Sequence, residues 1–397
     1  LRARISPSGV NGGTDVGIGD TGLAHSARIS KRPRYRSHFP SVSASGPQPE
    51  AMTFTPVHCP RPACPSNHGR SFSFHRRGFY HRKCDGKRVA QFQCRVCRKY
   101  CSSQTFRVNY RFRRPELDAQ VASHLVSKVT IRQTARILGC RRETVELRLA
   151  RYGIHGWIYH TRLLVGLKAR GGLAGDFQLD ELETFEADRR LSPVTLPVLI
   201  HQDSRLILHA TAGSMAARGN LTAHDESRRI DREKVTGRRT SESAACVTEC
   251  FKVLKDLVAE SARSTLKTDE KQLYASLLRR MDLPVRHERT ISTAPRTTRN
   301  PLFPINHTLA MFRDGVSRLV RRNWGASKMR QRLTLHLGLF IAWKNYVRRR
   351  FNRDRPEQSP GQWAGAHSAA ATMEEFLTWR IFPWRWKELP QSSSWAA

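Results

Sequence analysis

Two pairs of cysteines have the spacing of metal ligands, Cys59-x4-Cys64 and Cys94-x2-Cys97. Zn²⁺ binds four thiolate or imidazole ligands in a tetrahedron, and two short cysteine pairs on separate hairpins supply that arrangement. In a reducing compartment, clustered cysteines are more often metal ligands than disulfide partners. We therefore expect these four cysteines to bind one structural Zn²⁺, with Cys101 as the alternative ligand if one of them is not used.

Two aspartates follow apolar runs that are typical of β-strands. Asp180 comes after residues 177–179, and Asp269 comes after residues 265–268. Two carboxylates held side by side at neighbouring strand ends can bind Mg²⁺, which activates a water or a 3′-hydroxyl for attack on a phosphodiester. An acid after a strand is also common where no such site exists, so the spacing alone leaves a purely structural role open.

A helix-turn-helix pattern lies between the cysteines and the aspartates. Thr130 with Gln133 forms a capping box that starts one helix, Gly139-Cys140 gives a tight turn, and a second helix is predicted over 142–151. In a DNA-binding motif of this kind, the first residues of the second helix meet base edges in the major groove. Here those residues are suited to guanine and cytosine: Arg141, Arg142, Glu143 and Glu146. An ordinary pair of packed helices is the alternative interpretation.

The elements that must position the aspartates alternate between strand and helix signals. Strands are predicted over 177–180, 194–201, 206–211 and 265–269, and helices over 244–259, 274–281, 309–322, 328–351 and 373–379. Residues 214–242 are polar and charged and are predicted to form a loop or flexible insertion. Cys246 and Cys250 fall on one face of an amphipathic helix, where we expect them to be buried as small apolar residues.

The charge of the chain favours a polyanionic partner. Its 397 residues include 69 Lys and Arg against 33 Asp and Glu, a formal net charge of +36. Such an excess attracts nucleic acid, because neutralised phosphates release their condensed counterions. The longest apolar run, 335–343, is too short to span a bilayer. With no secretory segment at its start, the chain is expected in the cytoplasm, associated with the nucleoid.

The first 51 residues differ in composition from the rest. They are rich in Gly, Ser, Pro and Arg and show no apolar periodicity, and the first methionine is Met52. We expect this stretch to be disordered, as a tail or as translated upstream sequence, and a targeting or DNA-binding arm is the alternative.

Several short motifs then follow one another in a specific order. Cys94-Arg-Val-Cys97 and Ser103-Gln-Thr-Phe106 precede Arg132-Gln-Thr-Ala-Arg-Ile-Leu138 and Thr144-Val145. After them come Asp180-Glu181-x-x-Thr184-Phe185, Thr268-Asp269-Glu270 with Tyr274, Asn306-His307 with Arg313, and Ala342-Trp343-x-Asn345. This order, over roughly residues 55–350, resembles the DDE-type transposases of short bacterial insertion sequences, which carry an N-terminal zinc ribbon and a helix-turn-helix.

The resemblance implies an α/β fold with a zinc ribbon and a helix-turn-helix, followed by a ribonuclease H-like domain. That domain has a mixed sheet with its first three strands antiparallel and with helices on its flanks. The implied organisation is a tail over 1–51, a zinc ribbon over 52–110, a helix-turn-helix over 115–155, a transposase domain over 173–350 and a C-terminal tail over 351–397.

The resemblance also implies an activity and a catalytic site. It predicts cleavage and strand transfer at transposon ends, dependent on Mg²⁺ or Mn²⁺, by a homo-oligomer on double-stranded DNA, with no membrane partner. Asp180 and Asp269 would be the metal ligands. The third acid of the family is expected near Asn306-His307, where this chain has no carboxylate, so Asn306 or His307 would complete the site. The alternative is a degenerate, non-catalytic DNA-binding protein or regulator derived from such a transposase.

Overall fold

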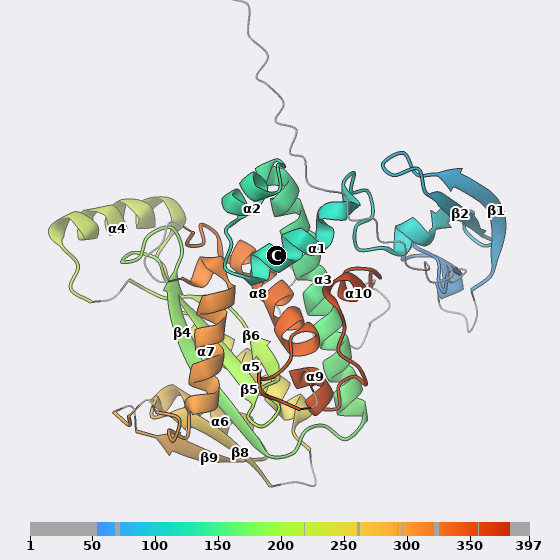
Figure 1. The fold of residues 1–397 in the computed structure, drawn as a ribbon. Helices are drawn as coiled ribbons and strands as arrows, with labels where there is room; N and C mark the ends of the chain where they lie inside the picture. The colour runs from blue at the N-terminus through green and yellow to red at the C-terminus, as the bar shows by residue number, and fades with distance from the viewer. Residues whose placement is uncertain are drawn as a thin grey trace, which may run out of the picture. The chain divides into compact units, whose positions relative to one another are not determined.

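The main sheet of the protein is built on a strand with almost no exposed residues, β5 (Pro193–His201). The computed structural model describes residues 54–67, 72–217, 219–259, 263–291, 293–295, 297–320, 325–355 and 357–381. Both the predicted tail over 1–51 and the end of the chain from 382 lie outside this part. From Phe54 onward the chain forms one compact unit (Figure 1).

The sheet is mixed, which confirms the predicted α/β class. Its strand order is β6 (Ile207–Ala210), β5, β4 (Asp176–Phe185), β8 (Ser264–Asp269) and β9 (Val285–Thr290), with the short β7 (Gly213–Ser214) paired to β5. Strands β4, β5 and β6 pair antiparallel, whereas β4, β8 and β9 pair parallel. The parallel pairs require crossovers, and helices supply them.

Helices cover both faces of this sheet (Figure 1). Gln178 on β4 accepts a hydrogen bond from the backbone N–H of Ile305, 2.8 Å away, at the start of α7 (Phe303–Gly315). Glu181 points to the other face, where it accepts hydrogen bonds from Ser243 of α5 (Ser243–Leu257) and Tyr274 of α6 (Gln272–Met281). Because side chains alternate along a strand, β4 has one face under α7 and one over α5 and α6.

One long helix joins the predicted helix-turn-helix to the sheet. Helices α1 (Asp118–Val126) and α2 (Ile131–Ile137) precede α3 (Arg142–Ala169), which packs against α8 (Arg330–Ala342). A Cβ added at Gly156 would lie 2.3 Å from the carbonyl oxygen of Gly338, so glycine is required at this crossing. Further along α3, His160 Nε2 donates to the carbonyl of Leu208 on β6 at 3.0 Å. The prediction of a helix over 142–151 was therefore too short, because packing against α8 continues it.

A buried ion pair holds α1 against α3. Asp118 Oδ1 accepts hydrogen bonds from Arg148 Nε (2.9 Å) and from the Tyr152 hydroxyl (2.6 Å), and Oδ2 accepts one from Asn109 (2.9 Å). Only 3% of Arg148 is exposed. The carboxylate thus ties α1 to two other segments, α3 and the loop that carries Asn109.

We expect Asp118→Ala to lower the free energy of unfolding by about 3–5 kcal/mol, because Arg148 would stay buried without its partner. Urea unfolding at neutral pH measures this loss. The exposed pair of Arg114 and Glu116 offers a matched control, since Glu116→Ala should change the free energy by less than about 1 kcal/mol. Equal effects of the two substitutions would show that the buried pair of Asp118 and Arg148 is no more important for stability than an exposed pair.

A second, smaller sheet lies in the cysteine-rich region. Strands β1 (Phe74–His81), β2 (Arg88–Cys94) and β3 (Tyr100–Ser102) pair antiparallel, with short 3-10 helices over Pro65–Asn67, Ser103–Phe106 and Pro115–Leu117. Its apolar core is small, with Phe92, Cys101 and Phe106 at the centre.

Several predicted elements have different bounds. The predicted loop over 214–242 was wrong, because it contains α4 (Ala223–Thr236), whose cap is Thr222 and whose charges pair at helical spacing, as in Arg229 with Glu233. The helix predicted over 309–322 begins at Phe303 and ends at Gly315, before a 3-10 turn over Ser317–Leu319. The helix predicted over 328–351 is α8 followed by a π-helical segment, Trp343–Val347.

The C-terminal part adds two short helices, α9 (Pro360–Trp363) and α10 (Met373–Phe376), the second within the predicted 373–379. Cys246 and Cys250 are buried on α5, as predicted. None of the helices in the described part of the chain is both long enough and apolar enough to cross a lipid bilayer.

Candidate zinc, DNA-binding and catalytic sites

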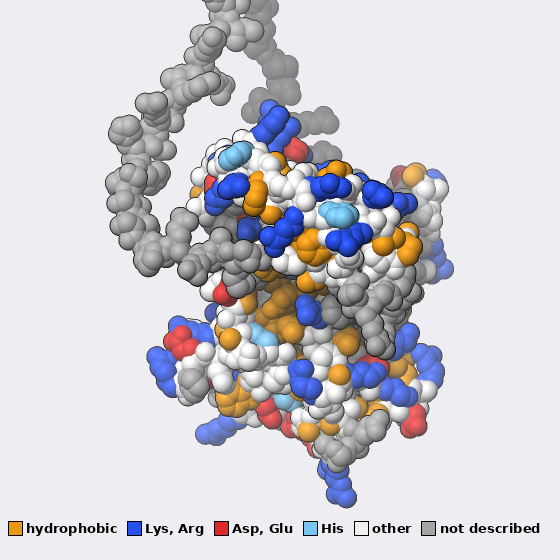
Figure 2. Space-filling model, turned by 90° about the vertical axis from the view of Figure 1, so that its right-hand side faces the viewer, with side chains coloured by type: hydrophobic (Ala, Val, Ile, Leu, Met, Phe, Trp, Pro, Cys, Tyr) orange, Lys and Arg blue, Asp and Glu red, His pale blue; other side chains and the backbone are white. Residues whose placement is uncertain are grey.

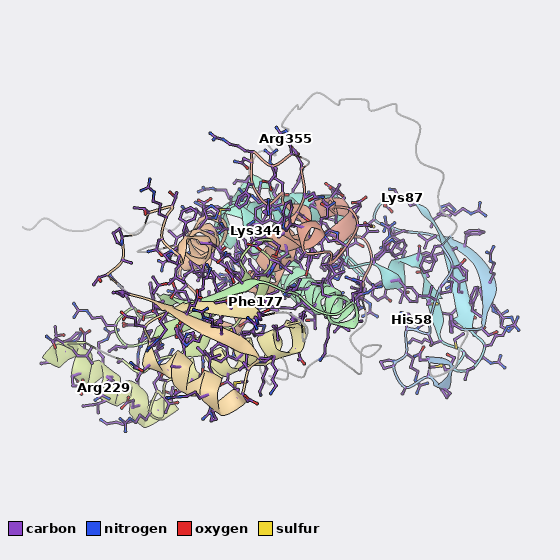
Figure 3. All side chains as sticks on the ribbon, turned by 90° about the horizontal axis from the view of Figure 1, so that it is seen from below. His58, Lys87, Phe177, Arg229, Lys344 and Arg355 are labelled. Atoms are coloured by element: carbon purple, nitrogen blue, oxygen red, sulfur yellow. The ribbon has the colours of Figure 1, made fainter. Side chains whose placement is uncertain are left out.

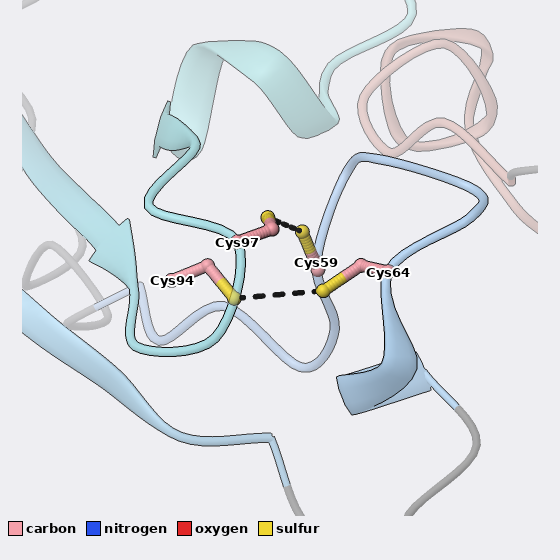
Figure 4. Close-up of side chains that lie close together, drawn as sticks. All are labelled: Cys59, Cys64, Cys94 and Cys97. Carbon is pink, nitrogen blue, oxygen red and sulfur yellow. Dashed lines mark hydrogen bonds between the residues drawn. The ribbon is translucent and has the colours of Figure 1, made fainter.

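The four paired cysteines converge on one point. Cys59 and Cys64 lie on the loop before β1, Cys94 ends β2, and Cys97 lies in the turn before β3 (Figure 4). The Sγ atoms of Cys59 and Cys97 are 3.4 Å apart, and those of Cys64 and Cys94 are 3.8 Å apart. All four ligand atoms lie within 4.8 Å of one another. Tetrahedral Zn–S bonds of about 2.3 Å place sulfurs about 3.8 Å apart, so this group is close enough to hold a metal ion.

The surroundings of Cys64 favour its thiolate form. Burial alone would raise the pKa of the Cys64 thiol, but the Ser66 hydroxyl, 3.0 Å from its Sγ, outweighs burial and lowers that pKa to about 6. Cys101 lies instead in the small apolar core, where burial raises its pKa to about 11. Among the described residues, Cys59, Cys64, Cys94 and Cys97 are the only group of three or more potential ligands at metal-binding distances.

The predicted helix-turn-helix has the expected local geometry. The Thr130 side chain accepts a hydrogen bond from the Gln133 backbone, and Gln133 reaches back to the Thr130 N–H, so the capping box is confirmed. Arg141 is the N-cap of α3 and Arg142 its first residue, both exposed. Arg142 makes ion pairs of 3.5 Å with Glu143 and 3.3 Å with Glu146. Such exposed pairs contribute less than about 1 kcal/mol, so Arg142 can exchange them for a ligand.

If α3 reads bases, Arg142→Ala should weaken binding to the specific duplex by about 1–3 kcal/mol and leave binding to random duplexes nearly unchanged. A competition assay at fixed salt measures both affinities. Arg353 is exposed and far along the chain, and Arg353→Ala should weaken both duplexes alike. Equal losses on the two duplexes for Arg142→Ala would show that α3 does not read sequence.

The cysteine-rich sheet also carries basic side chains. Seven of the eight residues of β1 are exposed, Arg76 and Arg77 among them. In the upper part of Figure 2, Lys and Arg side chains gather with few acidic residues between them. This surface therefore carries part of the positive charge of the chain.

The register of the sheet predicts that Asp180 and Asp269 are neighbours. The parallel register pairs Asp176 with Thr265 and Gln178 with Lys267, and the same offset two residues further on relates Asp180 to Asp269. Lys267 Nζ is 2.5 Å from Asp176 Oδ2, so these two side chains lie on the same face of the sheet. Because side chains alternate along a strand, Asp180 on β4 and Asp269 on β8 belong to that face as well. Neighbouring strands are about 4.8 Å apart, which lets both carboxylates reach one cation. Both residues are half-buried.

The prediction that Asp180 ends its strand was wrong. β4 continues to Phe185, because its second half still pairs with β5. On the other side, β8 ends at Asp269, so Asp180 lies where its parallel neighbour stops. Asp269 therefore lies at the end of its strand, whereas Asp180 lies inside β4, next to the point where β8 ends.

Helix α7 runs along β4, and Asn306 lies in its first turn. Its first turn is fixed by the bond from Ile305 to Gln178, and its last turn by a bond from Arg313 Nη2 to the Glu183 carbonyl at 3.4 Å. Asp180 lies between Gln178 and Glu183 on β4. Asn306 and Arg313 are seven residues apart and so share one flank of the helix, the flank along β4. By this helical spacing we expect Asn306 on the side of α7 nearest Asp180.

His307 has different surroundings. It lies about 100° further round the helix than Asn306. Its ring is 6.0 Å from that of Phe303, and burial followed by the charges of Arg205 and Lys344 lowers its pKa. The structure therefore places His307 among cations.

Sequence reasoning did not foresee the role of Glu181. Its carboxylate accepts hydrogen bonds from Thr195 (2.5 Å), Tyr274 (2.9 Å) and Ser243 (3.0 Å), and Lys271 Nζ lies 2.5 Å away. Lys271 and these hydroxyls hold the pKa of Glu181 low despite its burial. The alternation of side chains along β4 could have predicted that Glu181 and Asp180 have different roles, because adjacent strand residues face opposite sides of the sheet.

No protein-family model matches this chain, and a search of curated proteins found no match.

Proposed function

We propose that the protein is a metal-dependent polynucleotidyl transferase, the transposase of an insertion sequence. The observation that supports this proposal is the register of β4 and β8 up to Gln178 and Lys267, which, extended by two residues, would put Asp180 beside Asp269 on the face covered by α7. Three antiparallel strands followed by two parallel ones agree with the ribonuclease H-like domain that the sequence resemblance implies.

The residues fit two kinds of metal. Four cysteine sulfurs within 4.8 Å of one another suit a structural Zn²⁺. Asp180 and Asp269 offer the hard oxygen ligands that Mg²⁺ prefers, with the neutral amide oxygen of Asn306 as the third donor. Bound there, the ion would act as a Lewis acid at a phosphodiester. Because one charge fewer holds it than in a site with three carboxylates, we expect weak binding, a preference for Mn²⁺ and slow strand transfer.

Double-stranded DNA is the partner that this arrangement suits. The formal charge of +36 and the exposed Arg141 and Arg142 at the start of α3 support it. Helix α3 continues from these residues to the sheet, so DNA held at its start would be fixed in orientation relative to Asp180. We infer that copies of the protein assemble on the two ends of the element, in association with the nucleoid.

A strand-transfer assay tests the proposal. The substrates are duplexes taken from the two DNA ends that flank the gene, and the ion is Mn²⁺ or Mg²⁺. We expect slow, Mn²⁺-favoured joining by the natural protein and none by Asp180→Asn. Glu183→Gln is a matched control, because Glu183 is an exposed acid on the opposite face of the same strand. Equal activity of Asp180→Asn and the natural protein would refute the catalytic assignment.

The second candidate is a DNA-binding protein without catalysis. It is favoured by the absence of a third carboxylate near Asp180 and Asp269, since the described residues form no acidic group of three at metal-binding distances. In that case the natural protein would bind the same duplexes specifically and join none of them with either ion.

A further inference from the structure

One face of the cysteine-rich sheet is turned away from its apolar core. Strand β2 is the central strand of this sheet, between β1 and β3. Phe92 and Cys101 are paired in register and both belong to the apolar core. Because side chains alternate along a strand, Gln91 and Gln93 point to the other face, which we call the outer face. In Figure 3, Lys87 marks the turn between β1 and β2.

Two planar side chains from β1 lie across β2 on the outer face. Tyr80 is paired with Val89 of β2, and its hydroxyl is 3.2 Å from that of Ser102 on β3, so its ring crosses β2. Val89 is buried, which agrees with a ring lying over it. Arg77 donates two hydrogen bonds to Gln93 Oε1, from Nε at 2.9 Å and from Nη2 at 2.7 Å. Both planar groups are exposed and are fixed in place by hydrogen bonds.

A β-bulge brings these two residues to the same face. Arg77 and Tyr80 are three positions apart, a spacing that would put them on opposite faces of a regular strand. The register of β1 shifts just before Phe79, and Gly78 has a φ of 77° there. The extra residue reverses the alternation of side chains. Phe79 consequently shares the face of its partner Ala90, which packs against the apolar core.

Tyr100 adds a second ring to the outer face. It lies on β3, is paired with Gln93, and is 51% exposed. His75 on β1 is paired with Gln93 from the other side. Aromatic rings and guanidinium planes are the groups on which unpaired bases stack. The outer face therefore has the chemistry of a stacking platform.

The charge of this region suits a nucleic-acid strand. Between residues 54 and 106 the sequence has eleven Lys and Arg residues and one acid, Asp85. Asp85 pairs with Arg82, and a Zn²⁺ ion with four thiolates would add only about two negative charges. A clear positive excess remains, which phosphates can neutralise. Three exposed cations lie in the turn just before Tyr100: Arg95, Arg98 and Lys99.

We propose that the outer face binds an unpaired DNA strand, with bases stacked on Tyr80, Tyr100 and Arg77 and phosphates near the cations of the turn. A duplex keeps its bases stacked on one another, so it cannot use these planar groups. The choice of DNA over RNA rests on the proposed function, in which single strands of DNA are cut and joined. The candidate duplex site at Arg141 and Arg142 differs from this one in both residues and ligand.

The first test measures how the full chain binds a single-stranded oligonucleotide and the duplex of the same sequence, by fluorescence anisotropy at fixed salt. Tyr100→Ala should weaken single-strand binding about tenfold and leave duplex binding nearly unchanged. Tyr100→Phe keeps the ring and should bind both like the natural protein. Phe79→Ala is the matched control, because Phe79 is 58% exposed on the same sheet but on the opposite face. It should not weaken single-strand binding.

Hydrogen exchange of β2 equal to that of the natural protein shows that a variant keeps the sheet. In such variants, equal losses on single strand and duplex for Tyr100→Ala would assign the face to duplex DNA and overturn the proposal. No loss from Tyr100→Ala, or the same loss from Phe79→Ala, would overturn the stacking platform. Tighter binding of an RNA strand of the same sequence would overturn the choice of DNA.

The second test locates the strand. Ultraviolet cross-linking of the single-stranded oligonucleotide to the full chain, mapped by mass spectrometry, should label Tyr80 or Tyr100, and the duplex should label neither. Cross-links that all fall outside residues 74–102 would contradict the site. Neither test requires strand transfer, so the site can be tested even if the protein has no catalytic activity, and its failure leaves the candidate catalytic acids untouched.

Discussion

Removal of the metal from the four cysteines is expected to unfold residues 54–106 and to leave the main sheet folded. The apolar core of this region is small and is centred on Phe92, Cys101 and Phe106. Structural Zn²⁺ contributes about 10–16 kcal/mol in small modules of this kind, far more than such a core can supply. Without the ion, at least three buried thiols would also lose their ligand role. Hydrogen exchange before and after chelation, read by mass spectrometry, measures the change in each region.

Single substitutions give the matched comparison. Cys94→Ser removes a buried thiolate and should reproduce the effect of chelation, whereas Cys84→Ser changes an exposed cysteine outside the cluster. We expect one equivalent of zinc in the natural protein and in Cys84→Ser, and a large loss in Cys94→Ser. Unchanged protection of β2 after complete removal of metal would show that the ribbon folds without it.

The second large effect is expected from Asn306→Glu. This change places a carboxylate on the flank of α7 that runs along β4, near Asp180. A third negative oxygen ligand should strengthen divalent-metal binding by at least about tenfold, equivalent to about 1.4 kcal/mol, and reduce the preference for Mn²⁺ over Mg²⁺. Isothermal titration with each ion in the zinc-loaded protein measures the affinity, and the strand-transfer assay shows whether the rate follows.

The control for this change is Ala310→Glu. Ala310 is exposed on the same helix, one turn beyond Asn306, so it adds the same charge to α7 about 6 Å further along the helix axis. We expect no gain in metal affinity from it. An equal gain from both substitutions would mean that overall charge, and not a ligand at position 306, attracts the cation.

The sequence predicted features that depend on local chemistry. The cysteine pairs were assigned to one cluster from spacing alone, and the capping box at Thr130 was recognised because its two hydrogen bonds are local. The strands flanking Asp180 and Asp269 were found as apolar runs. The adjacency of the two acids stays a prediction, because register depends on the pairing of β4 with β8 across a long crossover, and the paired residues end at Gln178 and Lys267.

Features set by tertiary contacts could not be predicted in this way. α3 extends to Ala169 because glycines allow it to pack closely on α8. The sequence after residue 151 does not by itself predict this packing. The β9 strand, Val-Arg-His-Glu-Arg-Thr, is too polar to be recognised, and pairing with β8 makes it a strand. Helix α4 was missed because its stability comes from charge pairs and not from an apolar face. The position of Asn345 likewise depends on a tertiary contact, because its side chain bonds the backbone of Ile207.

The most direct test of the account is whether Asp180 and Asp269 hold one divalent cation together. Electron paramagnetic resonance counts bound Mn²⁺ in the zinc-loaded natural protein and in Asp180→Asn, Asp269→Asn and Glu183→Gln. The register of β4 and β8 predicts that either aspartate substitution abolishes the same weak site, while Glu183→Gln retains it. Mn²⁺ binding that survives in both aspartate variants, or no binding by the natural protein, would contradict the shared metal site.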